Sequence, residues 1–93
     1  MHSLQAIVPR ALTELLRQGP MSQGKLEVAW RAAVGDALCR VTTVRLQPDG
    51  GVEVLASDPR WNRELKRSSS MILTRLMGLL GADNVRRLSV AGK

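Results

Sequence analysis

A strand pattern that runs directly into a long amphipathic helix occupies residues 51–80 and constrains the fold more than any other part of the chain. Val52, Val54 and Ala56 take alternate positions, the period of two expected for a strand with one better-buried face. The segment after them carries a stripe at helical spacing, formed by Trp61, Leu65, Ser68, Ile72, Leu76 and Leu79. Because a helix must bury such a stripe, we expect this helix to supply the main surface of the core.

Both ends of this helix carry recognisable signals. Asp58 can accept hydrogen bonds from the unpaired N–H groups of the first turn, and Pro59 suits the first helical position because it lacks an N–H. At the other end, Gly81 is suited to terminate the helix. The sequence therefore predicts a helix from about Pro59 to Leu80.

Two shorter helices are expected before it. Apolar residues at close to helical spacing predict the first, namely Leu4, Ile7, Val8, Ala11, Leu12, Leu15 and Leu16. Pro9 either kinks a helix that starts at Ser3 or marks the first turn of a shorter one.

The second of these helices is predicted from the candidate cap Ser22 to about Leu38, with Trp30 on its apolar stripe. Gly35 lies inside this predicted helix, where glycine costs about 1 kcal/mol relative to alanine. We therefore expect another element to pack closely over Gly35.

A hairpin and a final strand complete the predicted sheet. Thr42, Val44 and Leu46 alternate with more polar residues, and the turn residues of 48–51 precede the strand that begins at Val52. A last strand is expected at about Val85 to Val90. The sequence predicts one α+β domain over residues 1–93, of order α-α-β-β-α-β, with helices on one face of a three-stranded mixed sheet.

Composition narrows the function. Fourteen Lys and Arg against eight Asp and Glu give a net charge of +6, which favours nucleic acid or an acidic protein surface as partner. Trp30 and Trp61 lie on apolar stripes and are interpreted as core anchors. Cys39 is the only cysteine, so no internal disulfide can form, and we expect a soluble, cytoplasmic protein.

Catalytic chemistry finds little support in the sequence. His2 lies at the terminus, and Cys39 is interpreted as a structural thiol. No metal-ligand spacing, phosphate-binding loop or nucleophile motif occurs. We therefore expect a protein that is not an enzyme and needs no cofactor, metal, membrane or small-molecule substrate.

The strongest binding signal is the basic face of the long helix, formed by Arg60, Arg63, Lys66 and Arg67. Such a face can bind nucleic-acid phosphates without reading sequence, or acidic groups on a protein. Arg86 and Arg87 are expected to add to the same side. The alternative is an ordinary solvated helix face, partly neutralised by Glu64.

Several short motifs, in this order and spacing, resemble the bacterial DciA family. Trp30 to Gly35 reads W-x-x-x-V-G, a hairpin follows, and Trp61 to Leu65 reads W-x-x-E-L at the start of the long helix. The segments Leu76–Gly81 and Val85–Leu88 are similar to the family's closing motifs. The resemblance covers about Leu12 to Val90, nearly the whole chain.

This resemblance implies a KH-like α/β domain that assists loading of the replicative DNA helicase. It implies that the chain binds the hexameric helicase and DNA, single- or double-stranded and independent of sequence, and hydrolyses no nucleotide. Two other classes remain open. One is a general RNA- or DNA-binding module without a helicase partner, and the other is a small adaptor whose basic helix meets an acidic protein.

Overall fold

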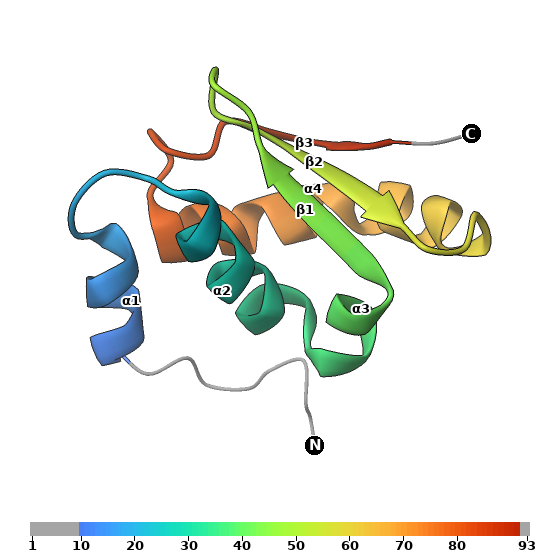
Figure 1. Cartoon of the computed structure of the whole chain (residues 1–93), viewed down its shortest axis with the longest axis horizontal. Coiled ribbons are helices and arrows are strands. Elements are labelled where there is room, and N and C mark those ends of the chain that lie inside the picture. Colours follow the sequence, from blue (N-terminus) through green and yellow to red (C-terminus); the bar gives the residue numbers. More distant parts are fainter. Residues whose placement is uncertain (1–9, 92–93) are drawn as a thin grey trace.

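A computed structural model describes residues 10–91, which form four helices and a three-stranded sheet (Figure 1). The helices are α1 (Arg10–Arg17), α2 (Gln23–Val34), α3 (Asp36–Arg40) and α4 (Arg60–Leu80). The strands are β1 (Thr42–Leu46), β2 (Gly51–Ala56) and β3 (Arg87–Val90). The predicted α+β class is confirmed, with α3 as an additional short helix.

The sheet is mixed and has the order β1-β2-β3. β1 and β2 form the predicted antiparallel hairpin, with Val44 opposite Val54. β3 lies parallel to β2, with Leu88 opposite Val52, and α4 is the crossover between these two strands. Since β2 and β3 run in the same direction, α4 must return along the length of the sheet before β3 begins.

The helices pack against one face of the sheet, and the other face is open to solvent. Val44, Val52 and Val54 point toward the helices and are buried, whereas Thr43 and Arg45 on the intervening positions are exposed. One continuous core results, in which the largest fully buried side chains are Trp30, Leu26, Leu65, Leu76, Leu80, Val52, Val54 and Val85. The predicted alternation of apolar and polar residues along the strands therefore determines which face of the sheet the helices cover.

The predicted signals at both ends of α4 are confirmed. The Asp58 Oδ1 accepts the backbone N–H of Arg60 at 2.9 Å, so the carboxylate caps the first turn. At the other end, Gly81 has φ +96° and its N–H donates to the Met77 carbonyl at 2.8 Å. Ser22 likewise caps α2, because its Oγ accepts the Lys25 N–H at 3.2 Å.

The prediction of one helix from Ser22 to Leu38 is wrong at Gly35. α2 ends at Val34, Gly35 takes φ +88° and ψ 166°, and α3 starts at Asp36 in a new direction. Within residues 10–91, no atom beyond the adjoining residues lies within 4 Å of the position that a Cβ on Gly35 would take, so the predicted close packing is also wrong. Gly35 is needed for its backbone conformation, which other residues adopt only with strain.

The remaining boundaries differ by small amounts from those predicted. α1 begins at Arg10, and the question of how Pro9 acts concerns residues outside the described range. β3 begins at Arg87, two residues later than predicted, and Val85 lies fully buried in the loop after α4. Within residues 10–91, none of the helices combines the length and the apolar character that crossing a membrane requires.

Two arginines hold the helices together through backbone carbonyl groups. The Arg75 guanidinium donates to the Ala33 carbonyl at 3.0 Å, in the last turn of α2. The Arg17 guanidinium donates to the Gly78 carbonyl at 2.6 Å, near the end of α4. Both guanidinium groups therefore lie at the carboxyl end of a helix, where backbone carbonyls lack partners within the helix. Arg17 and Arg75 thus stabilise the packing of the helices.

Candidate functional site

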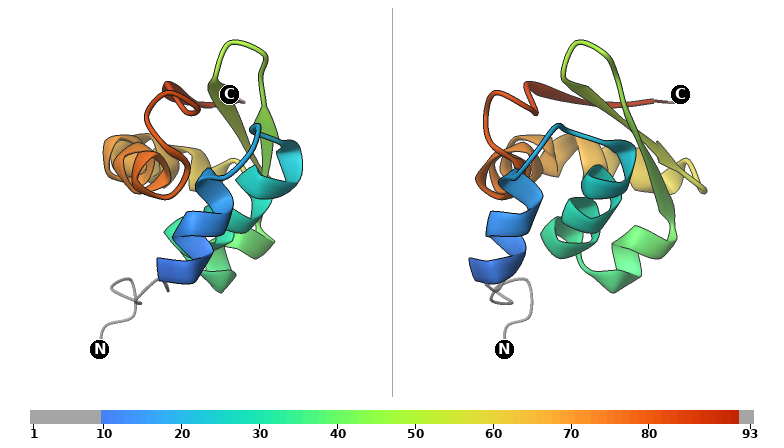
Figure 2. Two further views of the ribbon diagram at one scale, coloured as in Figure 1. Left: turned by 90° about the vertical axis from the view of Figure 1, so that its left-hand side faces the viewer. Right: turned by 60° about the vertical axis from the view of Figure 1, so that its left-hand side comes forward.

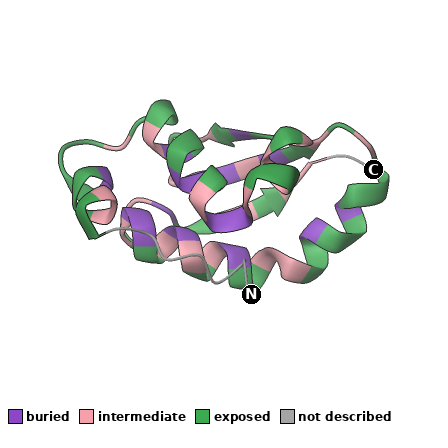
Figure 3. Ribbon diagram, turned by 90° about the horizontal axis from the view of Figure 1, so that it is seen from below, coloured by how far each residue is buried: buried purple, intermediate pink, exposed green. Residues whose placement is uncertain are grey.

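The predicted basic residues lie on the first two turns of α4, at the end of the helix farthest from α1. Arg60, Arg63, Lys66 and Arg67 are all exposed. Figure 3 shows this part of α4 as mostly exposed ribbon, with buried positions only where the helix meets the core. The structure therefore brings the four side chains together on one solvent-facing surface, as helical spacing predicts.

Two of the four cations already have acidic partners. The Arg60 guanidinium pairs with the Asp58 carboxylate at 2.8 Å. The hydrogen bonds from the Arg60 guanidinium and from its backbone N–H lower the pKa of Asp58. The Asp58 carboxylate in turn raises the pKa of the Arg60 guanidinium. Arg67 lies 3.9 Å from Glu64, a looser ion pair one helical turn away. The positive charges of Arg60 and Arg67 are therefore partly offset at neutral pH.

The side chains of Arg63 and Lys66 have no hydrogen bond or ion pair within residues 10–91. Together with Pro59, Arg60 and the side chain of Asn62, they line a shallow concave surface of about 600 Å³. Asn62 is 8% exposed and forms the floor next to the core. We call Arg60, Arg63 and Lys66 the cationic surface, because they share this concavity and Arg67 lies outside it.

The prediction that Arg86 and Arg87 extend this surface is wrong. Both lie at the start of β3, beside the start of β2, whereas α4 starts after the end of β2. The 21 residues of α4 separate the two places by about 30 Å. Arg87 pairs with Asp49 of the hairpin turn.

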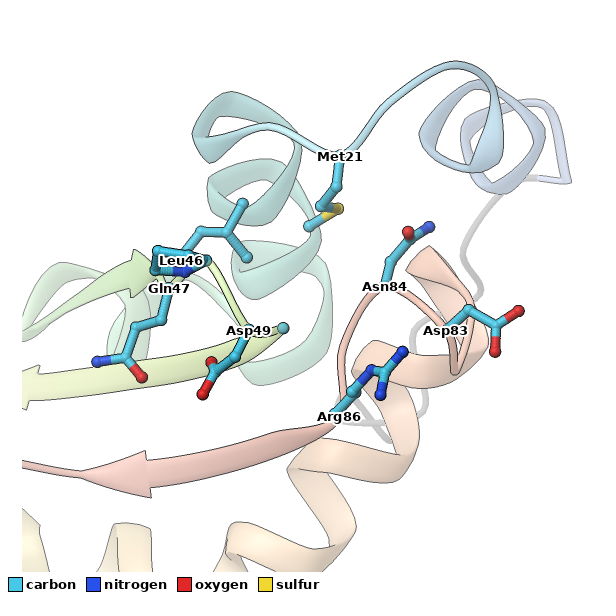
Figure 4. Close-up of a pocket in the computed structure, with 9 residues that line it drawn as sticks. Met21, Leu46, Gln47, Asp49, Asp83, Asn84 and Arg86 are labelled. Atoms are coloured by element: carbon cyan, nitrogen blue, oxygen red, sulfur yellow. The ribbon is translucent and has the colours of Figure 1, made fainter.

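Arg86 instead belongs to a second concave surface, of about 680 Å³. Figure 4 shows its side chain between the hairpin turn with Asp49 and the loop with Asp83 and Asn84. Met21 and Leu46 add apolar side chains. This cleft holds one cation and two carboxylates, so it is less positive than the cationic surface.

The prediction that Trp61 is a core anchor is also wrong. Its side chain is 39% exposed, whereas Asn62, the next residue, is buried. Trp61 lies at the margin of the buried stripe, in the first turn of α4, and α1 packs only near the far end of this helix. The prediction placed Trp61 in the core because its spacing matches the apolar stripe. Burial of Asn62 could not be predicted in the same way, because a polar side chain does not contribute to an apolar pattern.

Truncation of Trp61 should therefore cost less than truncation of a fully buried tryptophan. We expect Trp61→Ala to cost about 1–2 kcal/mol, because 39% of the residue is already in water. Leu65→Ala in the next turn is the matched control, and it should cost about 2–5 kcal/mol because Leu65 is 2% exposed. Urea unfolding followed by circular dichroism measures both. A loss above about 3 kcal/mol for Trp61→Ala would restore its predicted role as a core anchor.

Side chains suited to metal binding do not cluster in the described residues. Within residues 10–91, no three His, Cys, Asp or Glu side chains are placed to hold a metal ion. Cys39 is half-buried and is not joined in a disulfide. His2 lies outside the described range. The structure offers a concave surface lined by Arg60, Arg63 and Lys66.

The family comparison agrees with the motifs. Residues 3–90 match the model of the family described as Dna[CI] antecedent, DciA, which is nearly the whole chain. No curated protein and no solved structure gives a significant match. The family is associated with loading of the replicative DNA helicase, which gives a role related to DNA replication. On the extent of this match, the chain belongs to the DciA family.

Proposed function

We propose that this chain assists loading of the replicative helicase in the cytoplasm by binding both the helicase and DNA, without catalysing a reaction itself. The cationic surface is the proposed DNA contact. The observation that carries this proposal is that Arg63 and Lys66 lie side by side on a concave surface, with no acidic partner in the described residues. Unpaired cations in a concavity are free to bind phosphate oxygens and to release the counterions of DNA.

Backbone contacts of this kind do not distinguish bases. Arg63 and Lys66 lie on a helix face that carries no aromatic residue, because Trp61 projects from a different side of α4. DNA should therefore be held through its phosphates, with similar affinity for unrelated sequences.

Trp61 is the proposed contact with the helicase. A large aromatic side chain that is 39% exposed leaves apolar area in water, and such residues often dominate the energy of protein interfaces. Trp61 lies about 140–160° around α4 from Lys66 and Arg63, so DNA and the helicase would be held on nearly opposite sides of one helix. Trp61→Ala should then weaken helicase binding and leave DNA binding nearly unchanged.

Charge reversal tests the DNA contact. We expect Arg63→Glu with Lys66→Glu to weaken DNA binding at least tenfold and to reduce the slope of log affinity against log salt by about two. Fluorescence anisotropy with unrelated oligonucleotides over a range of salt concentrations measures both quantities. Folding should be retained, because exposed charges contribute little to stability. Arg60 is left unchanged since its charge reversal would also remove the ion pair with Asp58.

The matched control is Arg10→Glu with Arg40→Glu. These arginines are also exposed and make no hydrogen bond or close ion pair within residues 10–91, although Arg40 attracts Asp36 electrostatically, and their reversal changes the net charge equally. An equal loss of DNA affinity in the control would show that net charge alone matters. If the Arg63 and Lys66 variant lost only helicase binding, the cationic surface would belong to the protein partner. DNA binding with no detectable helicase binding would instead favour the general nucleic-acid module.

A further inference from the structure

The two lysines of the described residues, Lys25 and Lys66, differ in how far their amines are already engaged. Lys25 is half-buried, and its Nζ donates to the Gln18 carbonyl directly after α1. This bond spans the loop that leads from α1 to α2 in Figure 2. Lys66 is exposed, and its amine makes no hydrogen bond or ion pair within residues 10–91. Lys66 therefore carries the more accessible primary amine.

The neighbours of Lys66 are suited to hold a phosphate group beside this amine. Arg60, Arg63 and Lys66 follow one another at intervals of three residues, so their side chains are neighbours on the surface of α4. All three line the same concavity of about 600 Å³. The Arg63 guanidinium has no partner in the described part of the chain, and its paired donors match the oxygens of a phosphate. A small phosphate compound held by Arg63 would therefore lie close to the Lys66 amine.

We propose that Lys66 is an acetylation site and that Arg63 directs a small acyl phosphate, such as acetyl phosphate, to it. The Lys66 ammonium loses one proton to solvent, and the amine attacks the carbonyl carbon of the acyl phosphate. A C–N bond forms, and the bond between that carbon and the phosphate oxygen breaks. The leaving phosphate takes a second proton from the nitrogen. The products are acetyl-lysine and inorganic phosphate, and no other reactant is consumed.

Acetylation removes one positive charge from the cationic surface and replaces the ammonium group with a neutral amide. The regulatory consequence rests on the DNA contact proposed above, because a neutral Lys66 no longer attracts a DNA phosphate. A high concentration of acyl phosphate would then release DNA from the chain. DNA and the acyl phosphate also compete for Arg63, so bound DNA would protect Lys66. The acetylation itself does not depend on the DNA contact.

Mass spectrometry of proteolytic peptides measures acetylation of the unmodified protein during incubation with acetyl phosphate. Lys66 should be acetylated about fivefold or more faster than Lys25, because the Lys25 amine is held by the Gln18 carbonyl. Lys93 lies outside the described residues, and its peptide is followed separately. Addition of an oligonucleotide should slow acetylation at Lys66 and have little effect at Lys25.

Arg63→Gln tests whether this guanidinium directs the donor. The substitution should slow acetylation of Lys66 by acetyl phosphate about threefold or more, because it removes the paired donors for the phosphate. Arg67→Gln is the matched control and should have little effect, since Arg67 is also exposed but lies outside the concavity. N-acetoxysuccinimide is an acetyl donor without charge, so it reports the reactivity of the amine alone. It should acetylate Lys66 at similar rates in all three proteins.

Fluorescence anisotropy before and after treatment with acetyl phosphate measures the effect on DNA binding. The treated protein should bind an oligonucleotide about fivefold or more weakly, and the slope of log affinity against log salt should fall by about one. Lys66→Arg should have the same affinity before and after treatment, because its guanidinium remains protonated and is not acetylated. Lys25→Arg should lose affinity on treatment, as the unmodified protein does.

The possible failures can be told apart. Equal rates at Lys66 and Lys25 would overturn the assignment of Lys66, and an unchanged rate in Arg63→Gln would overturn the role of Arg63. Complete acetylation of Lys66 without loss of DNA affinity would overturn the regulation. In that event, normal DNA binding by the variant with Arg63→Glu and Lys66→Glu would show that the proposed DNA contact is wrong. Weak DNA binding by this variant would retain the contact and reject only its control by acetylation.

Discussion

Replacement of Trp30 with alanine should destabilise the fold by about 3–5 kcal/mol, the range measured for buried tryptophans. Trp30 is 1% exposed and is the largest fully buried side chain. Its indole N–H donates to the Thr42 Oγ1 at 2.8 Å, and the Thr42 hydroxyl donates to the Leu38 carbonyl at 2.8 Å. The ring therefore joins α2 to the start of β1 and to α3, besides filling the core. Truncation removes all of these contacts at once.

Urea unfolding followed by circular dichroism measures this loss. A domain of this size has a free energy of unfolding of about 5–15 kcal/mol, so the alanine variant could be largely unfolded without denaturant. Trp30→Phe keeps most of the ring and should cost less, and Thr42→Val should cost about 1–3 kcal/mol because it leaves the buried indole N–H without its acceptor. A cost below about 1 kcal/mol for Trp30→Ala would contradict the structure.

Local signals predicted much of this fold. The signals at the helix ends are local, because each joins groups no more than four residues apart. These are the carboxylate of Asp58, the hydroxyl of Ser22 and the backbone N–H of Gly81. Both partners of each hydrogen bond can therefore be recognised in a short stretch of sequence. The alternation of apolar residues in β1 and β2 is also enough to predict the hairpin, because the turn between the two strands fixes their pairing register. The parallel position of β3 follows from the crossover through α4.

Tertiary packing decided the features that the sequence did not predict. Trp61 and Leu65 share a stripe at helical spacing, yet only Leu65 is covered, because burial depends on where the neighbouring helices end. The pairing of Arg87 with Asp49 joins residues far apart in the chain. Spacing alone likewise could not show that Gln23 covers the edge of β1.

The basic face was predicted as a group, and the structure separates its members. Helical spacing placed Arg60, Arg63, Lys66 and Arg67 together, which is correct. It could not show that Asp58 holds Arg60 or that Arg67 lies outside the concave surface. These differences depend on side-chain orientation at the start of α4. Of the four, Arg63 and Lys66 are the two whose side chains have no acidic partner within residues 10–91.

Gly35→Ala should also destabilise the fold, by about 1–3 kcal/mol. With φ +88° and ψ 166°, Gly35 occupies a backbone region that is almost restricted to glycine. Its N–H donates to the Arg31 carbonyl at 2.9 Å and its carbonyl accepts the Cys39 N–H at 3.0 Å, so this one residue ends α2 and begins α3. An alanine must either bear the strain or shift both helices.

Gly78→Ala in α4 is the matched control for this substitution. Gly78 is exposed, lies within a regular helix and has no atom within 4 Å of the added methyl position. Alanine there should stabilise the fold by about 0.5–1 kcal/mol, because it has the higher helix propensity. Since neither methyl group meets a neighbour, the opposite signs isolate backbone conformation as the cause. Urea midpoints that rose for both variants would show that Gly35 tolerates a side chain, and that the break between α2 and α3 has another origin.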